Sequence, residues 1–152
     1  MALTKADVAF SGLIPNLIRL IGDWQPGGLA SELKYRDSAL QFIRNNVPSD
    51  CRVEREYRHN GTTTDIYLKW NGVFFNGEVF VEVKRDLNKK ATLDRLVGQV
   101  ESLEPGKRNI VIVLVGDTDE GLLRRLRAKY AAFENATYDA PLAIVAKRSA
   151  SV

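Results

Sequence analysis

The sequence predicts an α/β protein in which a mixed central β-sheet is flanked by helices. Two observations favour this class. Apolar residues recur at helical spacing up to residue 47, and three alternating segments follow between residues 52 and 84. After these, a helical segment leads to a continuous apolar run, as expected of a crossover connection to a strand covered on both sides. This order is typical of a mixed sheet with helices on its faces.

The length of 152 residues, with 45% hydrophobic and 27% charged residues, fits one globular domain with a sizeable core. No repeat or linker divides the chain, so we expect a single domain over residues 1–152. The single cysteine, Cys51, provides neither an internal disulfide nor a cysteine cluster for zinc, and favours a reducing, intracellular and cytoplasmic setting. The net charge of +3 is too mildly basic to indicate a partner by itself.

The segment Lys5–Ile21 predicts an amphipathic helix, which the Trp24–Gly28 stretch ends. Its apolar residues are interrupted by Asp7 and Pro15, unlike those of a signal peptide or a membrane span. We therefore expect no membrane partner.

A second helix is predicted from Leu29 to Val47, because Leu33, Leu40 and Ile43 continue an apolar stripe at helical spacing. Pro48 ends it.

From residue 52, apolar and polar residues alternate with a period of two. This alternation predicts strands over Arg52–His59, Thr63–Trp70 and Val79–Lys84. The segment Asn71–Asn76 contains Asn-Gly turn signals and is predicted to be the loop of a hairpin between the second and third strands.

The remaining elements follow the same reasoning. Thr92 is predicted to cap a helix whose apolar face runs to Leu103. The run Asn109–Val115 predicts a strand covered on both sides. A helix rich in Leu and Arg is expected over Glu120–Phe133, and a short strand over Leu142–Ala146.

One strand carries an unusual pair of side chains. In the sequence VFVEVKRD, Glu82 and Lys84 stand two positions apart, and such residues of a strand point to the same face. The pattern by itself is common, since Glu32-Leu33-Lys34 also fits it, and only its context gives it value.

That context is the hairpin. If Asp65 lies across from Glu82, Tyr67 faces Phe80, and the two carboxylates have Cβ atoms about 5 Å apart. They repel each other unless a charge neutralises them, and Mg²⁺ is commonly held by one or two carboxylates. Lys84 would then contact the metal-bound water or a phosphate.

A second register is open at this point. A two-residue turn at Asn71-Gly72 would place Asp65 opposite Glu78, and Glu82 about 13 Å farther along the strand, where no shared metal site forms. The longer loop is preferred because the short one needs Gly77 deep in a strand.

The order of Asp65, a hairpin, Glu82-Val83-Lys84, a helix and a buried strand resembles the PD-(D/E)XK nuclease superfamily over about Leu29–Val115. The resemblance implies a restriction-endonuclease-like αβββαβ core, with an added N-terminal helical extension over about residues 1–24 and a C-terminal αβ unit. It implies Asp65, Glu82 and Val83 at a Mg²⁺ site, where Mn²⁺ would substitute, and Lys84 as the catalytic lysine. The activity implied is hydrolysis of DNA phosphodiester bonds by an endonuclease, restriction-like or selective for a structure such as a junction.

Two further positions match the family more loosely. Glu32 fits the Glu that some members carry on the helix before the first core strand, and Gln99 fits a Gln on the helix after the motif. Two positions depart from it. Thr64 stands where Pro is often found, and Leu103 stands where one exonuclease branch has an aromatic residue, which argues against that branch.

Arg85, Lys89 and Lys90 directly follow the motif and are predicted to bind nucleic-acid phosphates, together with Arg58. A homodimer is expected to suit a symmetric substrate, with the N-terminal helix as the dimerisation element.

Alternatives remain open from the sequence. Asp65, Glu82 and Lys84 fit a structural salt-bridge network equally well by spacing alone. Glu32 fits a surface carboxylate that pairs with Arg36 at i+4, and the basic loop fits a solvated one. The whole chain also fits a non-catalytic nucleic-acid-binding or assembly module on the same fold.

Overall fold

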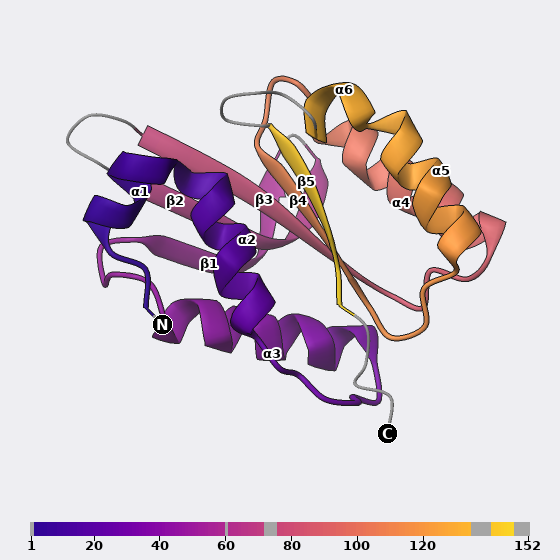
Figure 1. Ribbon diagram of the computed structural model, residues 1–152, viewed down its shortest axis with the longest axis horizontal. Coiled ribbons are helices and arrows are strands. Elements are labelled where there is room, and N and C mark those ends of the chain that lie inside the picture. The colour runs from indigo at the N-terminus through magenta and orange to yellow at the C-terminus, as the bar shows by residue number, and fades with distance from the viewer. Residues whose placement is uncertain (1, 60, 72–75, 135–140, 148–152) are drawn as a thin grey trace.

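A five-stranded mixed sheet forms the centre of the molecule, and helices cover both of its faces (Figure 1). The structure is a computed structural model that describes residues 2–59, 61–71, 76–134 and 141–147. The predicted α/β class with a mixed, helix-flanked sheet is confirmed.

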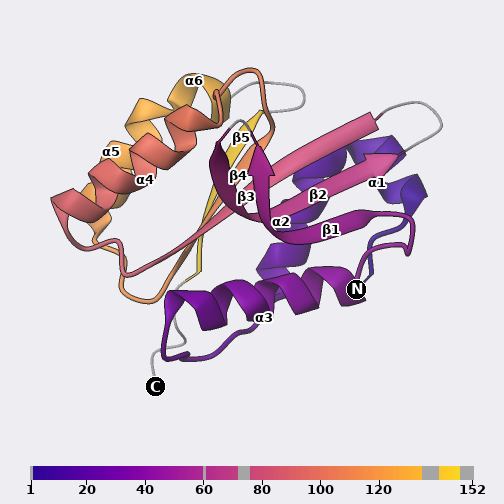
Figure 2. The ribbon, with the colours of Figure 1, turned by 180° about the vertical axis from the view of Figure 1, so that it is seen from behind.

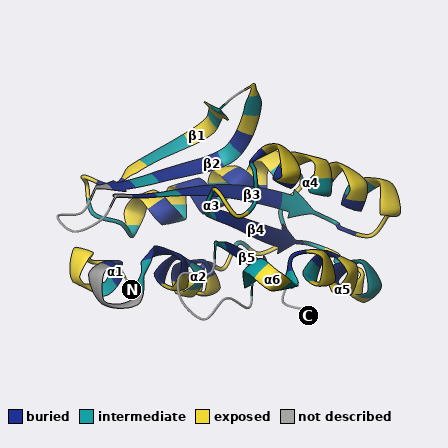
Figure 3. Cartoon of the chain, turned by 90° about the horizontal axis from the view of Figure 1, so that it is seen from above, coloured by how far each residue is buried: buried dark blue, intermediate teal, exposed yellow. Residues whose placement is uncertain are grey.

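The strands are β1 (Arg52–His59), β2 (Thr62–Asn71), β3 (Asn76–Arg85), β4 (Ile110–Val115) and β5 (Leu142–Ala146). They lie side by side in chain order. The pairs β1–β2 and β2–β3 are antiparallel, whereas β3–β4 and β4–β5 are parallel because helices connect these strands. All five predicted strands are present, and β4 is buried along its whole length, as its unbroken apolar sequence predicts (Figure 3).

The N-terminal segment contains two helices, α1 (Lys5–Ser11) and α2 (Leu13–Asp23), so the prediction of one helix is wrong. Gly12 stands between them with φ +88° and ψ 164°, a conformation essentially restricted to glycine. The side chain of Asn16 holds the corner, because its amide donates to the carbonyls of Asp7 and Gly12 at 2.9 and 2.6 Å.

Helix α3 (Glu32–Asn45) is shorter at both ends than predicted. The Ser31 hydroxyl accepts from Lys34 N at 3.2 Å and caps its first turn. Leu40 and Ile43 are buried as expected, but Leu33 is 59% exposed and does not belong to the buried stripe.

Helix α4 (Lys90–Ser102) begins two residues before the predicted cap. Its N-cap residue is Lys89, and the prediction that Thr92 caps it is wrong. The predicted last helix is divided into α5 (Glu120–Lys129) and α6 (Ala131–Glu134).

Strand alternation divides the core into two clusters. Val79, Val81 and Val83 face α1, α2 and α3, whereas Tyr67 and Phe80 face the layer of α4, α5 and α6. Figures 1 and 2 show these two groups of helices on opposite sides of the sheet.

The apolar face of α2 is used inside this chain, since its buried residues belong to the first cluster. In the described ranges, no helix combines the length and the apolar character needed to cross a membrane.

Candidate active site

The hairpin register brings the predicted acidic residues to the same place. Tyr67 pairs with Phe80 and Lys69 with Glu78, which confirms the longer-loop register and excludes the one that set Asp65 opposite Glu78. Asn71 pairs with Asn76, and residues 72–75 of the predicted loop lie outside the described residues.

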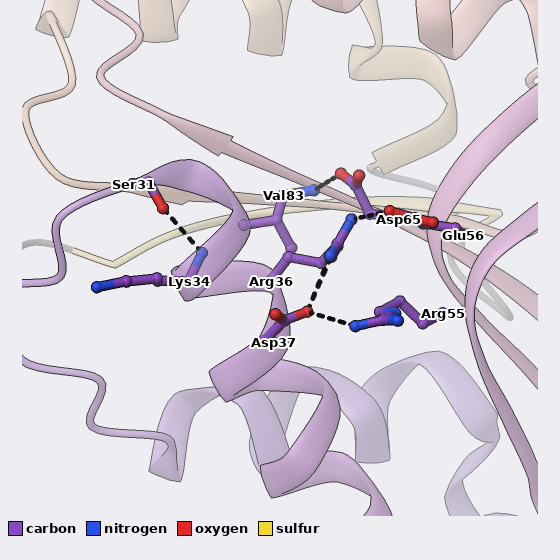
Figure 4. Close-up of polar contacts among 8 residues, drawn as sticks. All are labelled: Ser31, Lys34, Arg36, Asp37, Arg55, Glu56, Asp65 and Val83. Atoms are coloured by element: carbon purple, nitrogen blue, oxygen red, sulfur yellow. Dashed lines mark hydrogen bonds and ion pairs between the residues drawn. The ribbon is translucent and has the colours of Figure 1, made fainter.

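The strands separate where the site begins. The β2–β3 ladder ends at the pair Ile66–Val81, one position short of Asp65 and Glu82. Beyond it, the Asp65 carboxylate accepts a hydrogen bond from Val83 N at 2.8 Å (Figure 4). A side-chain oxygen thus takes the place of a ladder carbonyl, which fixes Asp65 against β3.

The neighbouring strand is irregular at the same level. The β1–β2 ladder pairs Arg55 with Ile66 and Tyr57 with Thr64 but includes no pair between Glu56 and Asp65 in the described chain. Glu56 has φ +54°, in the left-handed region that a Glu seldom adopts. The irregularity of β1 therefore lies directly beside Asp65.

Glu82 is buried, with 2% of its surface exposed, and its Oε1 accepts from the Thr64 hydroxyl at 2.7 Å. Burial and then the negative charge of Asp65 raise the pKa of Glu82 to about 8, and the Thr64 hydrogen bond and the Lys84 charge oppose the rise only partly. The fold therefore favours the protonated form of this carboxyl group, and a bound cation would favour the ionised form instead.

The pKa of Asp65 is also raised, chiefly by burial and further by the charge of Glu32. The Val83 hydrogen bond is the largest effect that lowers the pKa, and the hydrogen bond with Glu82 and the charge of Arg36 add to it. A buried carboxyl group beside a second, partly buried one forms a site that favours an added positive charge.

Glu32 and Lys84 complete the cluster from separate elements. Glu32 is the first residue of α3, and its Oε1 lies 3.5 Å from Lys84 Nζ, while its Oε2 accepts from Arg85 N at 2.9 Å. The beginning of α3 is thereby fixed to the end of β3. Glu32 does not form the predicted i+4 pair with Arg36.

Arg36 is a residue of this region whose part the sequence analysis missed. It is 5% exposed, and its guanidinium contacts Glu56 Oε1 at 2.6 Å and Asp37 Oδ1 at 2.9 Å (Figure 4). Its charge lowers the pKa of Asp65, which makes it a positive neighbour of the acidic cluster. No sequence signal links Arg36 to Glu56, because their contact depends on the irregular backbone of β1. Thr64 was noted in the sequence only as a departure from the family, yet it is the direct partner of Glu82.

The chemistry of the cluster fits a hard cation. Its acidic groups, Glu32, Asp65 and Glu82, offer only oxygen ligands, which suit Mg²⁺ and Mn²⁺. In the described residues, no set of three or more His, Cys, Asp or Glu side chains has the arrangement of a metal centre. A site of one or two carboxylates completed by water needs fewer. Val83 has a buried side chain and an amide engaged by Asp65, so it offers a metal only its carbonyl oxygen.

The other predicted residues lie around this cluster. Gln99 is exposed on α4, and no contact in the described chain joins it to the carboxylates. Arg85 donates to the carbonyl of Ala30 at 2.8 Å, and Lys89 and Lys90 are exposed at the start of α4.

Arg58 is exposed on β1 and lines a pocket of about 680 Å³ between α3 and β1. Arg44 and Arg55 line the same pocket, together with Glu54 and Glu56. Glu54 pairs with Arg52 and Glu56 pairs with Arg36. The three arginines of the lining therefore give the pocket a net positive charge.

Comparison of the chain with protein-family models, with curated proteins and with solved structures found no match in any of the three.

Proposed function

We propose that this protein is a Mg²⁺-dependent DNA endonuclease of the PD-(D/E)XK kind, either restriction-like or selective for branched DNA as a junction resolvase is. The observation that carries the proposal is the meeting of Asp65, Glu82, Lys84 and Glu32, which come from β2, β3 and α3. The element order from α3 to β4 is also that of the αβββαβ core the resemblance implies.

The chain's own residues have distinct parts in this proposal. Asp65 and Glu82 would hold the ion, aided by the carbonyl of Val83. A bound Mg²⁺ supplies activation of a water molecule and stabilisation of negative charge on the phosphate. Metal binding would compete with the proton on Glu82, because the raised pKa of this carboxyl group favours its protonated form. Lys84 lies beside Glu32, where its ammonium group can orient the nucleophile and contact the scissile phosphate.

The surroundings support a nucleic-acid substrate. The arginines of the pocket between α3 and β1 lie next to Glu56, whose partner Arg36 is a neighbour of Asp65. Arg85, Lys89 and Lys90 follow β3 on the other side of the motif. Cations on both sides of a cleavage site can hold the phosphates that flank the bond.

We also propose a homodimer, in which two sites would act on a symmetric substrate. Because α2 packs its apolar face against its own sheet, other surfaces would have to form the interface.

A second candidate is a non-catalytic nucleic-acid-binding or assembly module. The Thr64–Glu82 hydrogen bond and the Glu32–Lys84 ion pair favour it, since a purely structural network would use the same contacts. Against it stands the burial of Glu82 beside the partly buried Asp65, an arrangement that destabilises a fold in the absence of a cation.

The deciding experiment incubates the protein with plasmid and with branched DNA, in Mg²⁺ and in EDTA. We expect cleavage in Mg²⁺ only, and its loss in Asp65→Ala and in Lys84→Ala. Lys34→Ala and Asp94→Asn are matched controls, because both change a charged side chain that is exposed. Cleavage at the wild-type rate by either site variant would refute the nuclease, whereas DNA binding without any cleavage would support the second candidate.

A further inference from the structure

Arg108 carries an unsatisfied polar atom. In the described part of the chain, its Nε is the buried side-chain nitrogen or oxygen that has no hydrogen-bond partner. Buried donors without partners are rare in folded proteins, and each calls for an explanation such as an ion or water that the site takes up. A guanidinium is a strong donor whose planar fork matches phosphate.

The same residue lines a pocket of about 270 Å³. The pocket lies between β2, β3 and the connection from α4 to β4, and its lining residues are Lys69, Glu78, Phe80, Lys107, Arg108 and Asn109. In that connection, Glu104 at φ +59° and Gly106 at φ +92° turn the chain tightly before Lys107 and Arg108.

The charge in the pocket is positive. Three cations line it, and Glu78 is the single carboxylate of the lining; this carboxylate accepts a hydrogen bond from the Tyr67 hydroxyl. Lys107 pairs with Glu104 at 3.2 Å, but both side chains are exposed, and such a pair is weak. Lys69 makes no ion pair within the described residues, so its ammonium group remains available.

We propose that this pocket is a binding site for a phosphate group, held by Arg108 and Lys69 with help from Lys107. It is separate from the candidate active site, because Glu78 precedes Glu82 by four residues on β3, a distance of about 13 Å along a strand. The proposal stands on the three cations that line the pocket and on the Arg108 Nε that lacks a partner, and does not require that the protein cleave DNA. The phosphate has two possible sources, a free or small phosphorylated molecule and the backbone of a nucleic acid.

The test is a titration of the metal-free protein with inorganic phosphate, followed by ¹H–¹⁵N NMR at constant ionic strength set with chloride. We expect saturable shifts of the amides of Lys107, Arg108 and Asn109. Arg108→Gln and Lys69→Gln should each weaken binding roughly tenfold, the usual effect of losing one hydrogen bond to a charged group. Arg125→Gln, an exposed arginine on α5, should bind as the wild type does.

Glu78→Gln gives an independent check in the opposite direction. It removes the negative charge of the pocket and retains an acceptor for Tyr67, so phosphate should bind more tightly than to the wild type. Shifts that do not saturate, or equal affinity in the wild type, Arg108→Gln and Lys69→Gln, would overturn the proposal. If one variant fails to fold, the other two still decide it.

The second arm repeats the titration with a short single-stranded oligonucleotide in EDTA. Affinity at least tenfold above that of phosphate, lost in Arg108→Gln, assigns the site to a nucleic-acid backbone. Equal affinity assigns it to a small phosphorylated ligand. The metal-dependent cleavage assay is separate, so failure of this pocket and failure of the proposed nuclease are distinguished.

Discussion

At the scale of single residues, the burial of Glu82 is the most consequential feature. A buried carboxyl group whose pKa is raised prefers to keep its proton in the folded state. Its ordinary pKa is 4.5 and its pKa in the fold is about 8, so between these values the folded protein binds a proton that the unfolded chain has lost. The free energy of unfolding must therefore fall as the pH rises through this window.

The variant Glu82→Gln tests this consequence, because it cannot ionise. We expect the wild type, without divalent ions, to lose stability between about pH 5 and pH 8 by an amount on the order of a few kcal/mol relative to Glu82→Gln. Urea denaturation at several pH values measures the difference. Parallel curves for the two proteins would show that Glu82 ionises freely in the fold.

Arg36 supplies a second residue-scale prediction. Arg36→Gln removes the partner of Glu56 and Asp37, both of which are half exposed and can regain water. The expected loss is about 1–2 kcal/mol of unfolding free energy, between the values for exposed and fully buried pairs. Arg55→Gln is the matched control, because Arg55 contacts the same Asp37 at 3.7 Å from an exposed position and its removal should change little. Equal losses of unfolding free energy in the two variants would mean that the burial of Arg36 does not contribute to stability.

At the scale of elements, the corner between α1 and α2 depends on one backbone conformation. Gly12 holds φ +88° and ψ 164°, and a Cβ at that position is strained. Gly12→Ala should therefore destabilise the protein by about 1–3 kcal/mol.

Gly22→Ala is the contrast for that substitution. Gly22 lies in α2 with open space around its Cα, and alanine is favoured over glycine in a helix by up to about 1 kcal/mol. Thermal unfolding of the two variants should shift in opposite directions. If Gly12→Ala left the stability unchanged, the corner would tolerate a side chain at this position.

The elements themselves were largely predictable. Five strands and the central helices follow from apolar periods of two and 3.6, because those periods reflect which side of a local element is buried. The failures at Gly12, Thr92 and the division of α5 from α6 occur at helix ends, where tertiary contacts outweigh weak local preferences. Leu33 shows the same limit, since helical spacing alone does not say where the edge of the buried face lies.

At the scale of the whole molecule, Lys147 joins the end of β5 to the end of α2. It follows β5, and its ammonium group donates to the carbonyls of Ile21 and Gly22 at 3.0 and 2.9 Å, at the end of α2. Cations at this end of a helix satisfy carbonyls that lack helical partners. Figure 1 shows α2 beside β5, and the Lys147 contact joins these two elements.

Lys147→Met keeps most of the side-chain volume and removes these hydrogen bonds. The expected loss is about 1–2 kcal/mol of unfolding free energy. Lys34→Met, at an exposed position of α3, should stay within about 0.5 kcal/mol of the wild type. Denaturation by urea at neutral pH measures both, and similar values for the two variants would mean that the contact adds nothing to stability.

The sequence by itself determined the α/β class and the strands, because alternation and turn residues act over a few positions. It favoured the hairpin register that sets Asp65 at the level of Glu82, and the strand pairing of the structure decided it. Tertiary structure alone decided that Glu32 meets Lys84 across 52 residues, that Arg36 pairs with Glu56, and that Arg108 keeps a nitrogen without a partner. These contacts arise from the packing of distant segments and from an unusual backbone angle in β1, and neither leaves a periodic signal in the order of the residues.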